Sequence, residues 1–294
     1  MVFKSGFVTV IGRPNVGKST LINALVGDKV AITSPKPQTT RNRIKAVSSR
    51  EEGQIVFVDT PGFHKARNKL DEYMLGQVYQ GLDGIDLVLL LFDATSSFGK
   101  GDSYILKQVK EKGIPVIAVL NKIDRLDQER QNLRVKNYRQ ESALELIPIS
   151  ALKKKNLTKL EERIFSLLPE GPQYYPADMI TDQIEQFIIA ELIREKIFYL
   201  IREEIPYGIA VLIEEMEERD NGLFYIRATI YVEKKSHKGI IIGKNGLMLK
   251  EIGQGARRDI EKLLQTDVYL DLWVKILKDW RNKLGLLKRM GYKS

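Results

Sequence analysis

The sequence predicts an α/β fold in which a doubly wound, mostly parallel sheet is followed by a smaller α+β domain. Residues 7–25 run from an apolar strand through a glycine-rich loop into a helix. Two continuous apolar runs follow at 87–92 and 114–120, each after a polar helical segment, as is typical of parallel strands buried on both faces. A stretch rich in proline at 168–176 cannot continue a helix and indicates a connector between domains.

Length and composition agree with two domains. The 294 residues are 43% hydrophobic, which is enough for two packed cores, and we expect domains at 1–170 and 181–294 joined by a linker at 171–180. The chain has no cysteine and two histidines, which excludes disulfide frameworks and Cys/His zinc sites. No charged-then-apolar leader precedes the first strand, and no apolar run is long enough to span a membrane. We expect a cytoplasmic protein.

The glycine-rich loop has the chemistry of a phosphate cradle. Residues 12–19 read G-x-x-x-x-G-K-S, and Gly12 and Gly17 allow backbone N–H groups to point at polyphosphate oxygens. Lys18 can then reach the β- and γ-phosphates, and the Ser19 hydroxyl can ligate Mg²⁺. A chance match in a glycine turn is the alternative, which the strand before the loop and the helix after it disfavour. The cradle alone does not identify the nucleotide.

Two further segments carry residues suited to a nucleotide switch. The polar segment 28–43 is expected to be a mobile loop, in which Thr40 closes on the metal and the γ-phosphate when triphosphate is bound. We choose Thr40 over Thr39, although a capping or turn role for a threonine stays open. The strand at 54–58 leads into Asp59, which can hold Mg²⁺ through water, and Gly62, whose N–H can contact the γ-phosphate.

The base can be identified from the residues after the run at 114–120. Asn121-Lys122-Ile123-Asp124 places a carboxylate where it can accept both N1–H and N2–H₂ of guanine. Adenine offers neither donor at those positions, so a carboxylate there discriminates against it. The backbone N–H groups of Ser150 and Ala151, after a short strand, can bind guanine O6.

These motifs, in this order, resemble the GTP-binding domain of the translation-factor-like GTPase superclass, which has a P-loop NTPase fold. The resemblance covers about residues 5–170 and implies Mg²⁺ binding by Ser19, Thr40 and Asp59. It implies catalytic roles for Asn15, Lys18, Thr40 and Gly62. The residues it implies for GTP binding are Gly12, Asn15, Val16, Gly17, Lys18, Ser19, Thr20, Asp59, Gly62, Asn121, Lys122, Asp124, Ser150, Ala151 and Leu152.

One departure from the Ras-like pattern affects hydrolysis. Where those enzymes carry a water-orienting glutamine after the D-x-x-G glycine, this chain has Phe63, which has no donor or acceptor. Asn15 resembles the loop asparagine of GTPases that recruit K⁺ beside the phosphates, where the cation fills the role of an arginine finger. A local turn hydrogen bond is the alternative for Asn15, and both interpretations stay open.

Charge is unevenly distributed in the second half of the chain. Residues 172–222 carry 4 basic and 12 acidic side chains, whereas residues 223–294 carry 16 basic and 7 acidic ones. A basic segment this concentrated usually faces a polyanion such as nucleic acid or an anionic membrane surface. A solvated lysine-rich face is the alternative.

The second domain reads as helix–strand–strand–helix–helix–strand. We expect an amphipathic helix at 183–203, a hairpin of strands at 209–218 and 223–233, and a last strand at 268–276. The residues assigned to the apolar stripe of the helix and its charged edge are Ile184, Phe187, Ile188, Glu191, Leu192 and Phe198. The hairpin turn is assigned to Asp220-Asn221-Gly222, and a G-x-x-G loop joins the last two helices at Gly243–Gly246.

This order and loop resemble a KH domain of type II, in which the G-x-x-G loop clamps about four nucleotides of single-stranded RNA. A glycine turn without a ligand is the alternative. The residues assigned to RNA binding are Gly239, Ile242, Gly243, Lys244, Asn245, Gly246, Lys250, Arg257 and Arg258.

A GTPase domain followed by such a KH domain resembles the Era family of bacterial GTPases over essentially the whole chain. The resemblance implies a monomeric GTP hydrolase that binds the single-stranded 3′ end of small-subunit ribosomal RNA and acts in small-subunit assembly, with the GTP cycle gating RNA binding. One alternative is an RNA-binding adaptor with negligible turnover. Peripheral contact with the inner membrane is a further alternative, disfavoured because no strongly amphipathic basic helix carries exposed aromatics.

Overall fold

The computed structural model describes residues 2–201, 205–219 and 222–292. The chain divides into two compact units. The first comprises residues 1–33, 37–66 and 74–182, and the second comprises residues 34–36, 67–73 and 183–294. Among the described residues, no helix has the length and hydropathy needed to cross a membrane.

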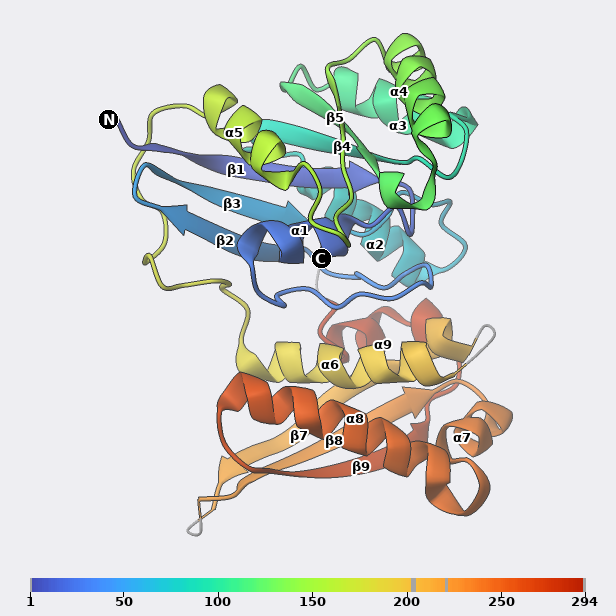
Figure 1. Cartoon of the computed structure of the whole chain (residues 1–294). Helices are drawn as coiled ribbons and strands as arrows, with labels where there is room; N and C mark the ends of the chain where they lie inside the picture. Colours follow the sequence, from blue (N-terminus) through green and yellow to red (C-terminus); the bar gives the residue numbers. More distant parts are fainter. Residues whose placement is uncertain (1, 202–204, 220–221, 293–294) are drawn as a thin grey trace. The chain divides into compact units, whose positions relative to one another are not determined.

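The first unit contains a six-stranded sheet in the order β2–β3–β1–β4–β5–β6 (Figure 1). All neighbours pair in parallel except β2 and β3, which form an antiparallel pair. The doubly wound, mostly parallel sheet expected from the sequence is therefore confirmed. The strands are β1 (Lys4–Gly12), β2 (Ile44–Arg50), β3 (Gly53–Asp59), β4 (Leu87–Asp93), β5 (Val116–Asn121) and β6 (Leu146–Pro148).

Helices cover both faces of this sheet. On one face Val78, Ile105 and Tyr138 of α2, α3 and α4 join a buried cluster with the residues of β4 and β5. On the other face lie α1 and α5, whose inward side chains are buried (Figure 1). The helices are α1 (Lys18–Val26), α2 (Lys69–Gln80), α3 (Lys100–Lys110), α4 (Gln128–Ser142) and α5 (Leu157–Leu167). The loops after β1, β3 and β5 leave the sheet at the same edge, where a ligand of an open α/β sheet binds.

The proline-rich segment after α5 lies along the first unit. Val47 N–H donates to Ile180 O at 2.9 Å, and Thr181 Oγ1 donates to Lys45 O at 2.7 Å, so residues 180–181 extend the edge of β2. The Tyr174 ring lies 4.9 Å from that of Phe7. The predicted linker is thus held against the sheet by backbone and side-chain contacts.

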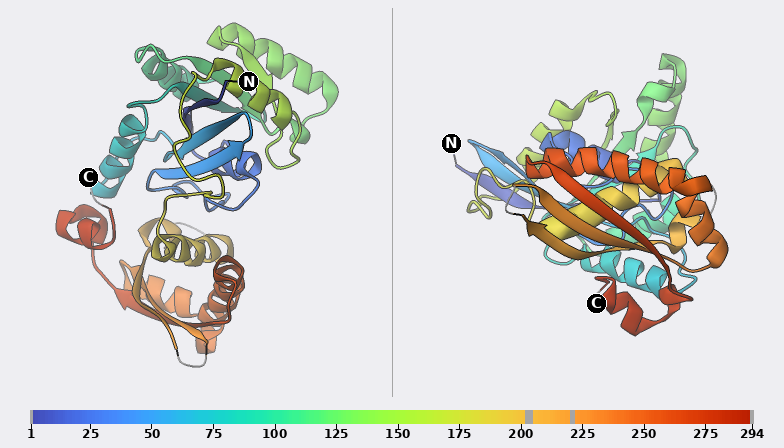
Figure 2. Two further views of the ribbon diagram at one scale, coloured as in Figure 1. Left: turned by 90° about the vertical axis from the view of Figure 1, so that its left-hand side faces the viewer. Right: turned by 90° about the horizontal axis from the view of Figure 1, so that it is seen from below.

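The second unit is a three-stranded sheet in the order β7–β8–β9, with β7 antiparallel and β9 parallel to β8. Helices α6 and α8 lie on the same side of the sheet (Figure 2), and the buried core includes Ile193, Ile230 and Ile252. The helix–strand–strand–helix–helix–strand order is confirmed. The elements are α6 (Glu185–Leu200), β7 (Ala210–Glu218), β8 (Phe224–Val232), α7 (Lys235–Ile242), α8 (Leu247–Leu264), β9 (Val268–Ile276) and a short α9 (Leu284–Arg289).

The apolar stripe assigned to the first helix of this unit was partly wrong. Ile184 is the N-cap of α6 and is 68% exposed, whereas Ile189, Ile193 and Ile197 form the most deeply buried row. Residues four apart share a helix face, and this row is the one that faces the sheet. Residues 202–204, where the helix was expected to end, and the turn residues 220–221 lie outside the described residues.

Candidate functional site

The glycine-rich loop leaves β1 at Gly12 and enters α1 at Lys18. A Cβ at Gly12 would lie 2.5 Å from the Leu91 carbonyl oxygen, and one at Gly17 would lie 2.4 Å from Asn121 Nδ2. Neither site has room for a side chain, and Gly17 also has a φ of 99°. The two glycines therefore let the loop pass close to β4 and β5, in the shape that exposes its N–H groups to a phosphate.

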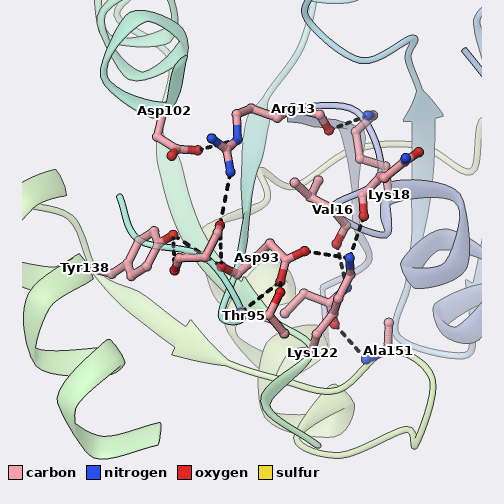
Figure 3. A network of polar contacts seen from close by, with 12 residues as sticks. Arg13, Val16, Lys18, Asp93, Thr95, Asp102, Lys122, Tyr138 and Ala151 are labelled. Atoms are coloured by element: carbon pink, nitrogen blue, oxygen red, sulfur yellow. Dashed lines mark hydrogen bonds and ion pairs between the residues drawn. The ribbon is translucent and has the colours of Figure 1, made fainter. Parts of the chain in front are cut away.

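Lys18 is buried in the loop. Its Nζ donates to Arg13 O at 3.3 Å, and its side chain extends back along the loop (Figure 3). Burial lowers the pKa of Lys18 to about 8, with the Asp59 carboxylate acting in the opposite direction. A phosphate beside this ammonium would favour the charged form further, because opposite charges at close range stabilise one another.

Three oxygen-bearing side chains meet next to the loop. Ser19 Oγ and Thr40 Oγ1 donate to Asp59 Oδ2 at 2.7 and 3.0 Å, and the two hydroxyls are 2.9 Å apart. Asp59 is fully buried, and its Oδ1 has no hydrogen-bond partner among the described residues. Burial raises the pKa of Asp59, against Lys18 and the two hydroxyls. Hydroxyl and carboxylate oxygens with one acceptor unused are the donor set that Mg²⁺ takes, so these residues fit the metal.

The side chains of Asn121 and Lys122 form hydrogen bonds with the backbone of the phosphate loop. Asn121 Nδ2 donates to Val16 O at 2.9 Å while its Oδ1 accepts from Ala151 N–H at 3.0 Å. Lys122 Nζ lies 2.6 Å from both Asn15 O and Asp93 Oδ2 (Figure 3). Burial alone would raise the pKa of Asp93, but hydrogen bonds from Lys122 and Thr95 outweigh it and lower the pKa. The motif thus joins the phosphate loop to the loops that carry the base-binding residues.

The remaining base-binding candidates lie in the loops after β5 and β6. Asp124 is exposed and accepts a hydrogen bond from the buried Ser150 Oγ, which orients its carboxylate. Leu152 is 69% exposed. An oriented, accessible carboxylate matches the requirement for guanine, although its contact with a base stays a prediction.

Sequence analysis missed the residues that fix the phosphate loop from the side of β4. Arg13 Nε lies 3.3 Å from Asp102 Oδ1, and Arg13 Nη2 donates to Ser96 Oγ at 3.0 Å (Figure 3). Asp102 is 2% exposed and also accepts from Gly99 N–H at the start of α3. Burial raises the pKa of Asp102, opposed by Gly99 N–H and Arg13. The only signal in the sequence was an arginine inside the loop motif.

Phe63 has a structural position. Its ring is buried in the cluster under α2 and α3, with centroids 5.8 Å from Tyr79 and 6.3 Å from Tyr104. At Gly62 a Cβ would lie 2.8 Å from Pro14 N, so the D-x-x-G glycine also allows a close approach to the phosphate loop. The side chain after that glycine therefore points into the core and orients no water.

The G-x-x-G loop borders a groove in the second unit. Gly243, Asn245 and Gly246 have positive φ. A Cβ at Gly243 would lie 2.7 Å from Met248 Cβ, so the tight turn requires glycine there. Lys244 and Asn245, between the two glycines, are exposed. The groove has a volume of about 430 Å³ and runs between α8 and β9. Three of the residues predicted to bind RNA line it, namely Gly246, Lys250 and Arg257. The other six do not: Gly239, Ile242, Gly243, Lys244, Asn245 and Arg258. The lining residues that sequence analysis missed are Leu249, Gly253, Gln254, Tyr269, Leu270 and Leu272.

The fold and these two sites define a P-loop GTP-binding protein with a C-terminal KH domain. The 50S ribosome-binding GTPase family matches residues 7–122, and the KH domain family matches residues 204–281. The chain is 65% identical to GTPase Era of Halothermothrix orenii over 294 residues, which is 100% of both chains. It is 52% identical to GTPase Era of Clostridium kluyveri over 99% of this chain and 100% of that one. The chain therefore belongs to the Era family of GTPases.

Two solved structures agree with this assignment. A single-residue variant of Aquifex aeolicus Era bound to GDP·AlF4⁻ has 41% sequence identity and a TM-score of 0.96, covering 99% of this chain and 100% of that one. A structure of Era with MgGDPNP and nucleotides 1506–1542 of 16S ribosomal RNA has the same identity, coverage and TM-score. Both the GTPase fold and the KH fold are thereby confirmed.

Replacing Arg13 with alanine should weaken GTP binding about fivefold to tenfold, because a partly buried ion pair that holds the loop is lost at a cost of about 1 kcal/mol. Titration with a fluorescent GTP analogue measures the change. The matched control is Arg130→Ala, which removes an exposed ion pair with Asp127 and should leave affinity within twofold. Equal affinities for the Arg13 variant and wild type would contradict a positioning role.

Replacing Asp124 with asparagine should shift preference from GTP toward xanthosine triphosphate, because an amide donor would face the guanine N–H donors. Competition between the two nucleotides measures the preference. Asp127→Asn is the control, since Asp127 is an exposed helix N-cap and asparagine also caps helices. GTP affinity unchanged by Asp124→Asn would remove the guanine assignment.

Proposed function

We propose that this protein hydrolyses GTP to GDP and phosphate, binds the single-stranded 3′ end of small-subunit ribosomal RNA, and acts in assembly of the small subunit. The observation that carries the proposal is that one chain contains two binding sites. They are the Ser19–Thr40–Asp59 group beside the phosphate loop and the groove beside the G-x-x-G loop. The structure of Era with MgGDPNP and 16S ribosomal RNA supports both halves.

The residues of the first site divide the work of binding the nucleotide. Lys18 and the loop N–H groups hold the phosphates, and Ser19, Thr40 and Asp59 would hold Mg²⁺, Asp59 through water. When bound, Mg²⁺ neutralises charge on the β- and γ-phosphate oxygens. Thr40 lies in a loop, so its contact with the metal can depend on which nucleotide is present.

Gating of RNA binding by the GTP cycle is supported by the path of the chain. The loop that carries Thr40 leads directly into β2 at Ile44. The edge of β2 is bonded to residues 180–181, shortly before α6 begins at Glu185. A shift of the Thr40 loop therefore acts on the strand that holds the segment leading to the KH domain.

The adaptor with negligible turnover is a second candidate, which the buried Phe63 favours because the side chain directly after Gly62 has no hydrogen-bonding group. Phosphate release in a single turnover separates the two functions. Cytoplasmic localisation, a monomeric state and peripheral contact with the inner membrane stay predictions.

Replacing Lys244 and Asn245 with aspartate should reduce RNA affinity by at least about a hundredfold while GTP affinity persists, because two carboxylates would face the phosphates. Aspartate tolerates the positive φ of Asn245, so the loop should keep its shape. The control pair Asn282→Asp and Lys288→Asp changes the net charge equally at exposed positions near α9. Full retention of RNA affinity would refute the RNA site, and loss of GTP binding as well would indicate unfolding.

Hydrolysis should be at least about tenfold faster in KCl than in NaCl at equal ionic strength if Asn15 recruits K⁺. Because Asn15 has a φ of 63°, Asn15→Ala adds backbone strain, and Asn15→Gly is the better variant. The glycine variant should erase the difference between the salts and keep GTP affinity. Equal rates in both salts for wild type, measured with RNA present, would favour a group supplied by a partner.

A further inference from the structure

The side of the KH sheet that faces away from α6 and α8 carries exposed aromatic rings. Along β9, Tyr269 and Trp273 are 55% and 54% exposed, and on β8 Tyr225 lies opposite Tyr269 in the register of the parallel pair. Because alternate residues of a strand share a face, these three rings lie on one side of the sheet. We call them the open aromatic face, and the right-hand view of Figure 2 shows the strands in front of α6.

The rings are stacked across the sheet toward its edge. The rings of Tyr225 and Tyr269 are nearly parallel, with an interplanar angle of 12° and centroids 5.9 Å apart. The Arg219 guanidinium lies 4.1 Å from the Tyr225 centroid, so a cation and two rings form a column. Since β9 is an edge strand, the outer face of Tyr269 is turned toward the edge of the sheet.

The last ring of this column, that of Tyr269, borders the groove beside the G-x-x-G loop. Tyr269 lines that groove together with Lys250 and Arg257, so the same ring belongs to both surfaces. Trp273 lies four residues further along β9, about 13 Å away at the rise of a strand. A strand of RNA that leaves the groove at Tyr269 and turns around the edge strand onto the open side would reach this second exposed ring.

Three carboxylates beside these rings have hydrogen-bond or ion-pair partners. Asp271 Oδ2 accepts from Trp273 Nε1 at 2.8 Å and from Tyr225 Oη at 3.4 Å, which fixes the indole. Glu215 pairs with Arg227 at 2.8 Å, and Glu217 lies 3.9 Å from Arg219. Glu215 and Glu217 thus lie beside arginines and Asp271 is occupied by two neutral donors, so the accessible feature of the face is aromatic surface beside a basic groove.

We infer that the open aromatic face stacks the bases of single-stranded RNA that continues past the G-x-x-G groove. This inference rests on the proposed RNA binding and extends it. A KH groove holds about four nucleotides, so further contacts need another surface. Aromatic side chains stack any base, which makes them suited to a strand whose sequence-specific part lies in the groove. Continuity with the groove through Tyr269 selects RNA as the occupant over a protein.

The test uses two single-stranded RNAs from the 3′ end of small-subunit ribosomal RNA, one of about five nucleotides that fills the groove and one of about twelve. Trp273→Ala should weaken binding of the longer RNA about tenfold and leave the shorter within twofold. Trp273→Phe should restore most of the affinity because it keeps a ring. Tyr199→Ala, at a 55% exposed tyrosine on α6, is the control and should change neither.

Tryptophan fluorescence gives an independent measurement. The chain has two tryptophans, and Trp280 is fully buried and donates to Gly208 O at 2.9 Å. The longer RNA should therefore quench the emission of Trp273, the shorter should not, and Trp273→Phe should abolish the effect. No quenching together with unchanged affinity of Trp273→Ala would overturn the inference, as would equal weakening for both RNAs. Failure of the shorter RNA to bind the wild type would instead overturn the proposed function.

Discussion

The buried carboxylate of Asp59 is the constraint on which the nucleotide site depends. An ionised carboxylate without water costs several kcal/mol unless charges and donors surround it. Lys18 and Ser19 at the start of α1 and Thr40 from the loop before β2 supply them at the end of β3. One oxygen nevertheless stays without a hydrogen bond among the described residues. The carboxylate of Asp59 is thus stabilised in the folded protein, and its second oxygen stays available as a ligand for a cation.

On the side away from Asp59, the phosphate loop is held by charged side chains whose ion pairs form without a ligand. Arg13 reaches Asp102 of α3, and Lys122, which pairs with Asp93 at the end of β4, also donates to Asn15 O in the loop. Asn121 adds a bond to Val16 O in the middle. A loop fixed in this way loses little conformational freedom when phosphate binds, and the binding free energy is correspondingly larger.

Much of this arrangement could be predicted because its signals are local in the sequence. A strand, a glycine loop and a helix lie within residues 7–25, and the KH order follows from two helices around Gly243–Gly246. The pairing of Arg13 with Ser96 spans 83 positions and follows no motif, so only the folded chain brings them together. The same holds for Tyr269, because a strand pattern does not show which exposed residue faces a groove. The stripe of α6 failed at Ile184 because the position of the helix start was uncertain.

The position of Phe63 limits how water can be activated in this enzyme. Withdrawing that ring from its cluster would expose apolar surface at a cost of about 2 kcal/mol, and the freed ring would still offer no hydrogen bond. In this chain the residue after Gly62 therefore cannot orient water as the glutamine of Ras-like enzymes does. The phosphate loop itself contains the polar residue Asn15, whose carbonyl oxygen accepts a hydrogen bond from Lys122 Nζ. The φ of 63° and this hydrogen bond fix the backbone of Asn15, and with it the direction of the Cα–Cβ bond, within a loop whose N–H groups are shaped for phosphate.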